Sequence, residues 1–189
     1  MNALLLRSTT MTGLLLFLFV ACSAERYWDY EPLSITTSTT DPTKLRIDAK
    51  TERLGRDEYA LTINFDLNYD IDDTTMMEAI ALRSPTGSED DYRPMPWSME
   101  KQPFNQGLKN YYADILYKNF GPCSNLPLPE NVYPVPKDKY RLEKCVISGE
   151  GMPEVAPNGY YKVIYNVTGE VDWALVCIVK VFQKNDFMG

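Results

Sequence analysis

Histidine is absent from all 189 residues of the chain. The sequence therefore lacks the most common general base, the most common zinc ligand and the side chain that titrates near physiological pH. Neither Gly87-Ser88 nor Ser148-Gly149 resembles a nucleophile elbow, and no motif singles out a pair of catalytic carboxylates. We expect a protein that is not an enzyme and has no metal and no cofactor. A hydrolase of an unrecognised type is the alternative that the missing histidine most disfavours.

Long apolar runs are also missing, apart from one at the N-terminus. Residues 14–20 are apolar, Arg7 is the only charge before them, and small residues follow at 21–24. This is the pattern of a signal peptide, cleaved after Ala24. The run is shorter than the roughly 20 residues of a membrane helix, so no membrane span is expected. We predict a secreted, extracellular protein with a signal peptide at 1–24 and one domain at 25–189.

A second interpretation of the N-terminus is a bacterial lipobox at residues 19–22. In that case Cys22 would carry a lipid anchor. Phe19 stands where such boxes prefer leucine, which favours the signal peptide. Its removal leaves 165 residues, enough for one domain with a sizeable core.

Positive charge is scarce. After removal of the signal peptide, 18 basic and 26 acidic residues remain, a net charge of −8. No basic cluster interrupts this acidic balance, so nucleic acid and anionic lipid headgroups are not expected as partners. Asp70, Asp72 and Asp73 lie close together, but the Thr-Thr-Met sequence that follows does not fit a calcium-binding loop. We interpret these aspartates as a solvated turn.

Apolar and polar residues alternate along several segments, which is typical of half-buried antiparallel strands. The two clearest pairs are joined by turns at 55–57 and 168–170 and are predicted hairpins. Since both faces of the last segment are apolar, we expect it to be covered on both sides. The predicted strands are residues 45–49, 59–69, 76–82, 160–167 and 171–182.

Residues 84–136 differ in texture, being rich in proline, glycine and aromatic residues, and most of this segment is predicted to be loop. Apolar residues at helical spacing predict one short amphipathic helix over 104–120, which Gly121-Pro122 would end. No alternation of strands with helices and no internal repeat is present. The predicted fold class is mainly all-β, an antiparallel β-sandwich or β-cup with one short helix in a long loop.

The C-terminal third carries a series of motifs. Residues 134–142 read Pro-x-x-Lys-x-x-Tyr-x-Leu, and Pro153, Gly159, Tyr161-Lys162 and Cys177 follow in order. Together with Trp28-Asp29 after the signal peptide, this order resembles the GM2-activator type of lipid-binding protein. It is still more similar to the insect chemosensory-B proteins, which are secreted relatives of that activator. The resemblance covers about residues 134–182, and elsewhere it concerns order and spacing only.

The resemblance implies a β-cup with a hydrophobic cavity that binds a lipid or another long apolar molecule. The chemosensory-B branch further implies taste or pheromone sensing, with the protein secreted around sensory neurons and a neuronal receptor or channel as a partner. A secreted interaction protein without a bound lipid, such as a receptor co-factor or a reproductive-tract protein, is the alternative function.

Three cysteines remain after the signal peptide, an odd number in an oxidising compartment. Tyr133 and Glu31 stand about where the activator carries cysteines. The resemblance thus leaves a disulfide between Cys123 and Cys145, stabilising by about 3 kcal/mol, and a buried free thiol at Cys177. A glycosylation sequon, expected at a hairpin end, begins at Asn166.

Methionine and aromatic side chains in the middle segment could line a cavity, because such residues adapt to and shape apolar ligand sites. A long loop without regular structure is often functional. Ordinary core packing is the alternative for each residue taken singly. The residues that we expect to bind the ligand are Phe65, Leu67, Met76, Trp97, Phe104, Leu108, Tyr112 and Ile115.

Overall fold

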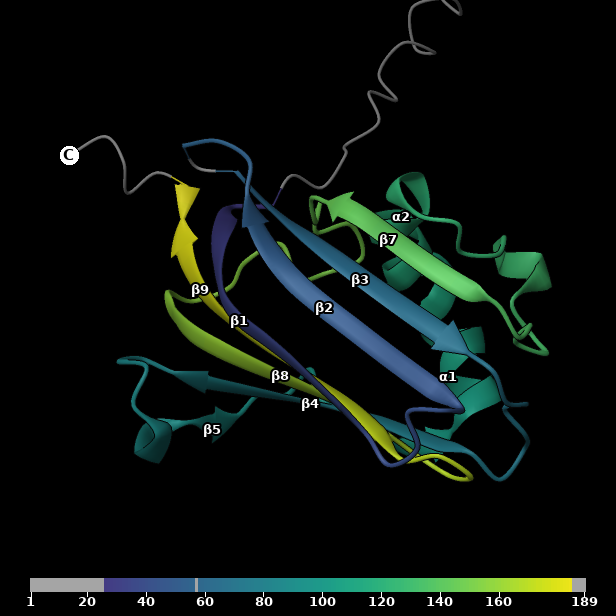
Figure 1. Cartoon of the computed structure of the whole chain (residues 1–189). Helices are drawn as coiled ribbons and strands as arrows, with labels where there is room; N and C mark the ends of the chain where they lie inside the picture. The colour runs from purple at the N-terminus through teal and green to yellow at the C-terminus, as the bar shows by residue number, and fades with distance from the viewer. Residues whose placement is uncertain (1–25, 57, 185–189) are drawn as a thin grey trace, which may run out of the picture.

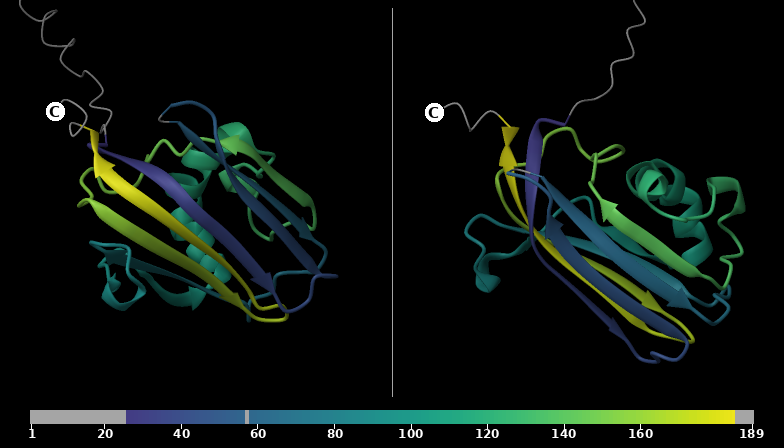
Figure 2. Two further views of the ribbon diagram at one scale, coloured as in Figure 1. Left: turned by 60° about the vertical axis from the view of Figure 1, so that its left-hand side comes forward. Right: turned by 45° about the horizontal axis from the view of Figure 1, so that its top comes forward.

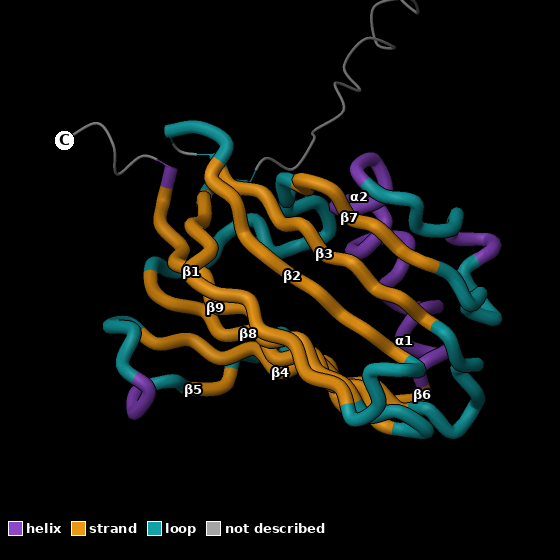
Figure 3. Tube along the Cα trace, viewed as in Figure 1, coloured by secondary structure: helices purple, strands orange, loops and turns teal. Residues whose placement is uncertain are grey.

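The computed structural model describes residues 26–56 and 58–184, so the predicted signal peptide lies outside the described residues. The described chain consists mainly of antiparallel strands in two sheets, with a short run of helix at one side (Figure 1). This confirms the predicted fold class. The two sheets diverge like the walls of a cup (Figure 3).

The larger sheet has the order β1-β9-β8-β4, and two short strands extend it beyond β4. All its pairings are antiparallel. The predicted C-terminal hairpin is present as the β8–β9 pair. The strands of this sheet are β1 (Trp28–Thr39), β4 (Met76–Ser84), β5 (Arg93–Pro94), β6 (Met99–Pro103), β8 (Gly159–Thr168) and β9 (Trp173–Gln183).

The smaller sheet contains β2 (Leu45–Arg53), β3 (Tyr59–Leu67) and β7 (Lys139–Cys145) in that order. The predicted N-terminal hairpin is therefore present as the β2–β3 pair, in which Leu45 lies opposite Leu67. The next predicted strand, β4, does not continue this sheet but crosses to the larger one and pairs with β8. Strands β1 and β7 were not predicted.

One edge of the cup is closed where β1 meets β2. The Thr37 hydroxyl of β1 donates a hydrogen bond to the Ile47 carbonyl of β2, with 3.0 Å between the oxygens. The two strands come from different sheets and are not paired as a ladder. This contact holds the sheets together at one side, so the cavity must be closed elsewhere by other elements.

The opposite side is covered by a helical segment made of α1 (Phe104–Tyr111), η2 (Tyr112–Tyr117) and α2 (Lys118–Phe120), in agreement with the predicted helix. It begins beside β4 and β6 and ends beside β7 (Figure 2). Its middle turn, η2, is a π-helix, a rare form found mostly at functional sites. The described one-turn helices are η1 (Glu89–Asp91), η3 (Gly121–Cys123) and η4 (Pro129–Asn131).

A disulfide joins Cys123, just after the helical segment, to Cys145 at the end of β7. It ties the helical side of the cup to the smaller sheet. Cys177 is a free thiol in β9, as the resemblance implied.

The last predicted strand, β9, lies between β1 and β8. Its Leu175 and Cys177 face the inside of the cup. Val176 and Ile178 point to the outer face, where they are half-buried between neighbouring strands and no layer of the described chain packs over them. The expectation that β9 is covered on both sides is therefore wrong for the described chain: cross-strand neighbours, not a second layer, shield its outer face.

Candidate functional site: an apolar cavity

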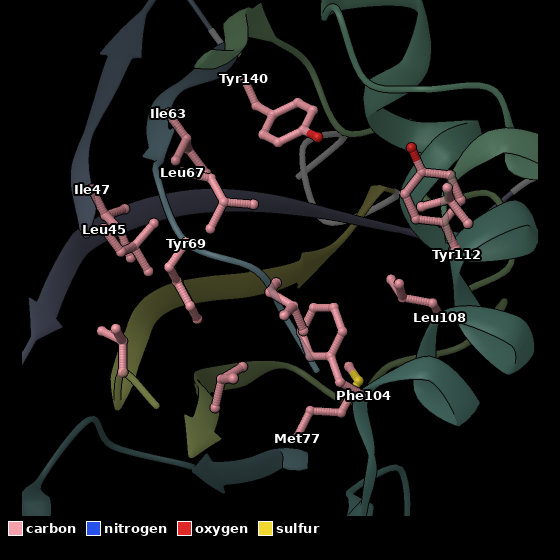
Figure 4. Close-up of a cluster of buried hydrophobic side chains, with 14 of the residues drawn as sticks. Leu45, Ile47, Ile63, Leu67, Tyr69, Met77, Phe104, Leu108, Tyr112 and Tyr140 are labelled. Carbon is pink, nitrogen blue, oxygen red and sulfur yellow. The ribbon is translucent and has the colours of Figure 1, made fainter. Parts of the chain in front are cut away.

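The two sheets, the helical segment and two loops enclose a cavity of about 610 Å³. This volume falls within the usual range of small-molecule sites. The loops that complete its wall contain residues 126–135 and 147–156. The close-up in Figure 4 shows side chains from the smaller sheet facing Tyr112 and Leu108 of the helical segment, with Tyr140 between them and Phe104 below.

The sheet walls follow from strand geometry. Successive side chains of a strand point to opposite faces of the sheet, so every second residue of a strand faces the cavity. From β9 these are Trp173, Leu175, Cys177, Val179 and Val181, and from β3 they are Leu61, Ile63, Phe65 and Leu67.

The helical wall has its own periodicity. Phe104, Leu108 and Tyr112 are four residues apart and lie on one face of the helix, as expected for an amphipathic helix. The wider π turn then brings the adjacent Ile115 and Leu116 to the cavity together. A sequence with helical spacing thus supplies a continuous apolar wall opposite the sheets.

Seven of the eight predicted ligand-binding residues line this cavity: Phe65, Leu67, Trp97, Phe104, Leu108, Tyr112 and Ile115. Trp97 lies at the rim, 40 % exposed, with its ring stacked parallel to that of Tyr161 at 5.9 Å between centroids. These positions are those of a cavity wall.

Met76 is the exception and does not line the cavity. In β4 it lies opposite Thr168 of β8, on the outer face, whereas its neighbour Met77 points inward and is only 2 % exposed. A Cβ on Gly107 of α1 would lie 2.1 Å from the Met77 sulfur, so the helix packs directly on this side chain. The prediction for Met76 was wrong by one residue of strand register.

The prediction missed most of the larger sheet's wall. Tyr165 of β8 and Trp173 of β9 pack with ring centroids 5.5 Å apart, and Phe65 of β3 meets Trp173 edge-on at 5.9 Å. The alternation in β8 and β9 could have identified these inward positions. It could not have separated a cavity wall from a packed core.

The interior is hollow and not merely apolar. Val163 of β8 faces the cavity, yet 38 % of its surface is accessible. Aliphatic side chains that face a close-packed core lose nearly all of their accessible surface. The remaining accessible surface of this inward-facing valine therefore indicates room for a ligand.

The cavity wall has almost no free polarity. In the described part of the chain, no charged side chain and no side chain of serine, threonine, asparagine or glutamine lines it. The hydroxyls of Tyr112, Tyr140 and Tyr161 donate to the carbonyls of Pro127, Pro136 and Pro157, and the Trp28 indole N–H donates to Pro153. The hydroxyl of Tyr30 accepts from the Ile147 amide. These aromatic rings thus present apolar surface inward while their polar atoms anchor loops.

Burial also keeps the titratable groups of the wall neutral. It raises the pKa of Tyr112 to about 12 and the pKa of the Cys177 thiol to about 11. Desolvation disfavours the charged form in both cases. The wall therefore carries no charge at physiological pH.

A buried amide holds one loop over the helical segment. The Asn119 Nδ2 donates to the carbonyls of Ile115 and Glu150, both at 2.8 Å. Its Oδ1 accepts from the Ser148 hydroxyl at 3.0 Å and from the Gly149 amide at 2.8 Å. We call this set of bonds the Asn119 clasp, and it joins the loop of residues 148–151 to the helical wall.

No metal centre is present among the described residues, which contain no suitable group of three histidine, cysteine or acidic side chains. Asp72 instead forms the predicted turn, because its Oδ1 accepts from the Thr74 amide at 2.9 Å and the Thr74 hydroxyl at 2.7 Å. These hydrogen bonds lower the pKa of Asp72. No helix within residues 26–56 or 58–184 is long and apolar enough to span a membrane.

The sequon residue Asn166 lies within β8, on the outer face of the larger sheet, and not at the hairpin end itself. Its Nδ2 donates to Glu78 Oε1 at 3.0 Å, and the side chain is half-buried. Thr168, the third residue of the sequon, is the last residue of the strand.

Residues 77–163 match a family model described as a protein of unknown function, DUF1091. The matched range runs from β4 into β8 and includes the helical wall, the disulfide and β7. No curated protein matches the chain. The match fits a secreted lipid-binding family only loosely, and no named relative supports the chemosensory-B or the GM2-activator type in particular.

Proposed function

We propose that this protein is a secreted, non-catalytic carrier that encloses a lipid-like or hydrocarbon ligand. The observation that carries the proposal is the apolar cavity of about 610 Å³, whose wall in the described chain carries no charged side chain. Water finds few hydrogen-bond partners on such a wall, whereas the transfer of an apolar molecule from water into the cavity is favourable.

The expected driving force is large enough for stable binding. A ligand that buries roughly 300 Å² of apolar surface gains about 7.5 kcal/mol at 25 cal/mol per Å², before the costs of ordering. The apolar N-terminal run at residues 14–20 supports secretion.

We further propose that the carrier works in chemical sensing, in taste or pheromone response, and passes its ligand to a receptor or channel of a sensory neuron. Support for this narrower role comes from the motifs of residues 134–182 and Trp28-Asp29, which resemble the chemosensory-B proteins. The alternative, a secreted interaction protein with no ligand, would leave the cavity without a purpose.

Filling the cavity tests the proposal. Val163→Trp places a large ring inside, and Ile164→Trp places the same ring on the outer face of the same strand. The uncharged fluorescent probe N-phenylnaphthylamine should bind the unmodified protein and Ile164→Trp, and binding to Val163→Trp should fall at least roughly tenfold. If the probe does not bind, or if both variants bind it equally, the cavity is not a ligand site and the interaction protein becomes the better account.

A further inference from the structure

Among the tyrosines of the cavity wall, Tyr165 differs from the others in how its hydroxyl is bonded. The hydroxyls of Tyr112, Tyr140 and Tyr161 each donate to a backbone carbonyl. The Tyr165 hydroxyl points instead to the Met77 sulfur, at 3.8 Å. A thioether is a weak acceptor, so this donor is poorly satisfied.

Tyr165 also lies deep inside the cup. It is in the middle of β8, with its ring against Trp173, and burial raises its pKa. A buried hydroxyl without a good acceptor is costly, and an oxygen from a ligand would remove that cost. In the described wall the Trp173 indole N–H beside Tyr165 lacks a hydrogen-bond partner, whereas the hydroxyls of Tyr112, Tyr140 and Tyr161 are bonded to carbonyls. Tyr165 therefore offers a hydrogen bond through which this cavity could choose among apolar ligands.

The same wall disfavours a buried anion. No lysine or arginine of the described chain lines the cavity, so a carboxylate drawn inside would lose its water without gaining a counter-ion. Arg26 stacks on Trp28 and Tyr30, two residues of the wall, but it already bonds the Ile147 carbonyl and Asp29. A charged headgroup would therefore have to stay in solvent.

We infer that Tyr165 is a specificity-determining residue: its hydroxyl donates to the acceptor oxygen of an uncharged long-chain ester, ether, aldehyde or ketone. This inference rests on the proposed carrier function and adds the chemical class of the ligand. An alkane fits the cavity but leaves the Tyr165 hydroxyl with only the Met77 sulfur as an acceptor. A fatty-acid anion brings a negative charge for which the described wall has no basic partner.

Three ligands of twenty non-hydrogen atoms separate these classes: icosane, hexadecyl acetate and octadecanoate. Each displaces N-phenylnaphthylamine from the secreted protein in a competition assay. Tyr165→Phe should weaken hexadecyl acetate about tenfold, the value of one lost hydrogen bond, and leave icosane unchanged. Tyr160→Phe, a matched control on the outer face of the same strand, should change neither. Octadecanoate should bind the unmodified protein at least roughly tenfold more weakly than the acetate at neutral pH.

Equal weakening of icosane and the acetate in Tyr165→Phe, no weakening of the acetate, or octadecanoate binding as tight as the acetate would each overturn the inference while leaving the carrier proposal intact. If neither the probe nor any of the three ligands binds, the carrier proposal is overturned. Met77→Leu provides a second test if Tyr165→Phe does not fold. Removing the competing sulfur should strengthen acetate binding and not icosane binding, and an unchanged acetate affinity would reject the role of Tyr165.

Discussion

The free thiol of Cys177 provides a chemical test of the cavity from within. Burial raises its pKa from 9.0 to about 11. Because only the thiolate attacks alkylating reagents, the reactive fraction at pH 8 falls by about 100-fold. Alkylation by iodoacetamide should therefore be about 100-fold slower than for an ordinary thiol. The rate for Cys177 should keep rising up to about pH 11, whereas the rate for an ordinary thiol levels off near pH 9.

The neighbouring position supplies the control. Ile178 follows Cys177 in β9 but lies on the outer face of the sheet, so Ile178→Cys in a Cys177→Ser background presents a thiol outside the cup. Cys177 is the only free cysteine among the described residues, which keeps the assay simple. A bound apolar ligand should slow alkylation of Cys177 further and leave the control unchanged. Similar rates for the two thiols at pH 8, or a plateau near pH 9 for Cys177, would refute a dry interior at this position.

Two further predictions concern the closure of the cup. Asn119→Ala removes the clasp and leaves buried backbone groups without partners, so the free energy of unfolding should fall by about 2–4 kcal/mol in urea denaturation. Asn105→Ala, which removes a 3.4 Å hydrogen bond to Asp73 at the surface, should change the free energy of unfolding by less than about 0.5 kcal/mol. Equal losses in the two variants would show that the clasp has no special stabilising role. Replacing both Cys123 and Cys145 by alanine should cost about 3 kcal/mol through loop entropy over their separation of 22 residues; an unchanged denaturation midpoint would contradict this.

Local patterns predicted the parts of the fold that local contacts determine. The hairpins β2–β3 and β8–β9 join neighbours in sequence and alternate clearly, so the residues alone predicted them. Strand β1 was missed because Pro32 and the run of serine and threonine that follows obscure its alternation. Its pairing with β9 joins opposite ends of the chain, which no local pattern specifies.

The site was predictable on its helical side more than on its sheet side. Phe104, Leu108 and Tyr112 share a helix face, and that face could only point to the interior. On the sheets, the alternation of β9 was recognised, but alternation looks the same for a packed core and for a hollow one. The choice of Met76 over Met77 shows a second limit, because a shift of one residue moves a strand side chain to the opposite face.

The most direct test of the central claim is native mass spectrometry of the protein as secreted, followed by organic extraction and identification of any bound molecule. We expect one uncharged, long-chain molecule per protein chain, lost when Val163→Trp fills the cavity. A clean mass without ligand, together with no uptake of icosane or hexadecyl acetate, would contradict the claim that this cup carries an apolar ligand.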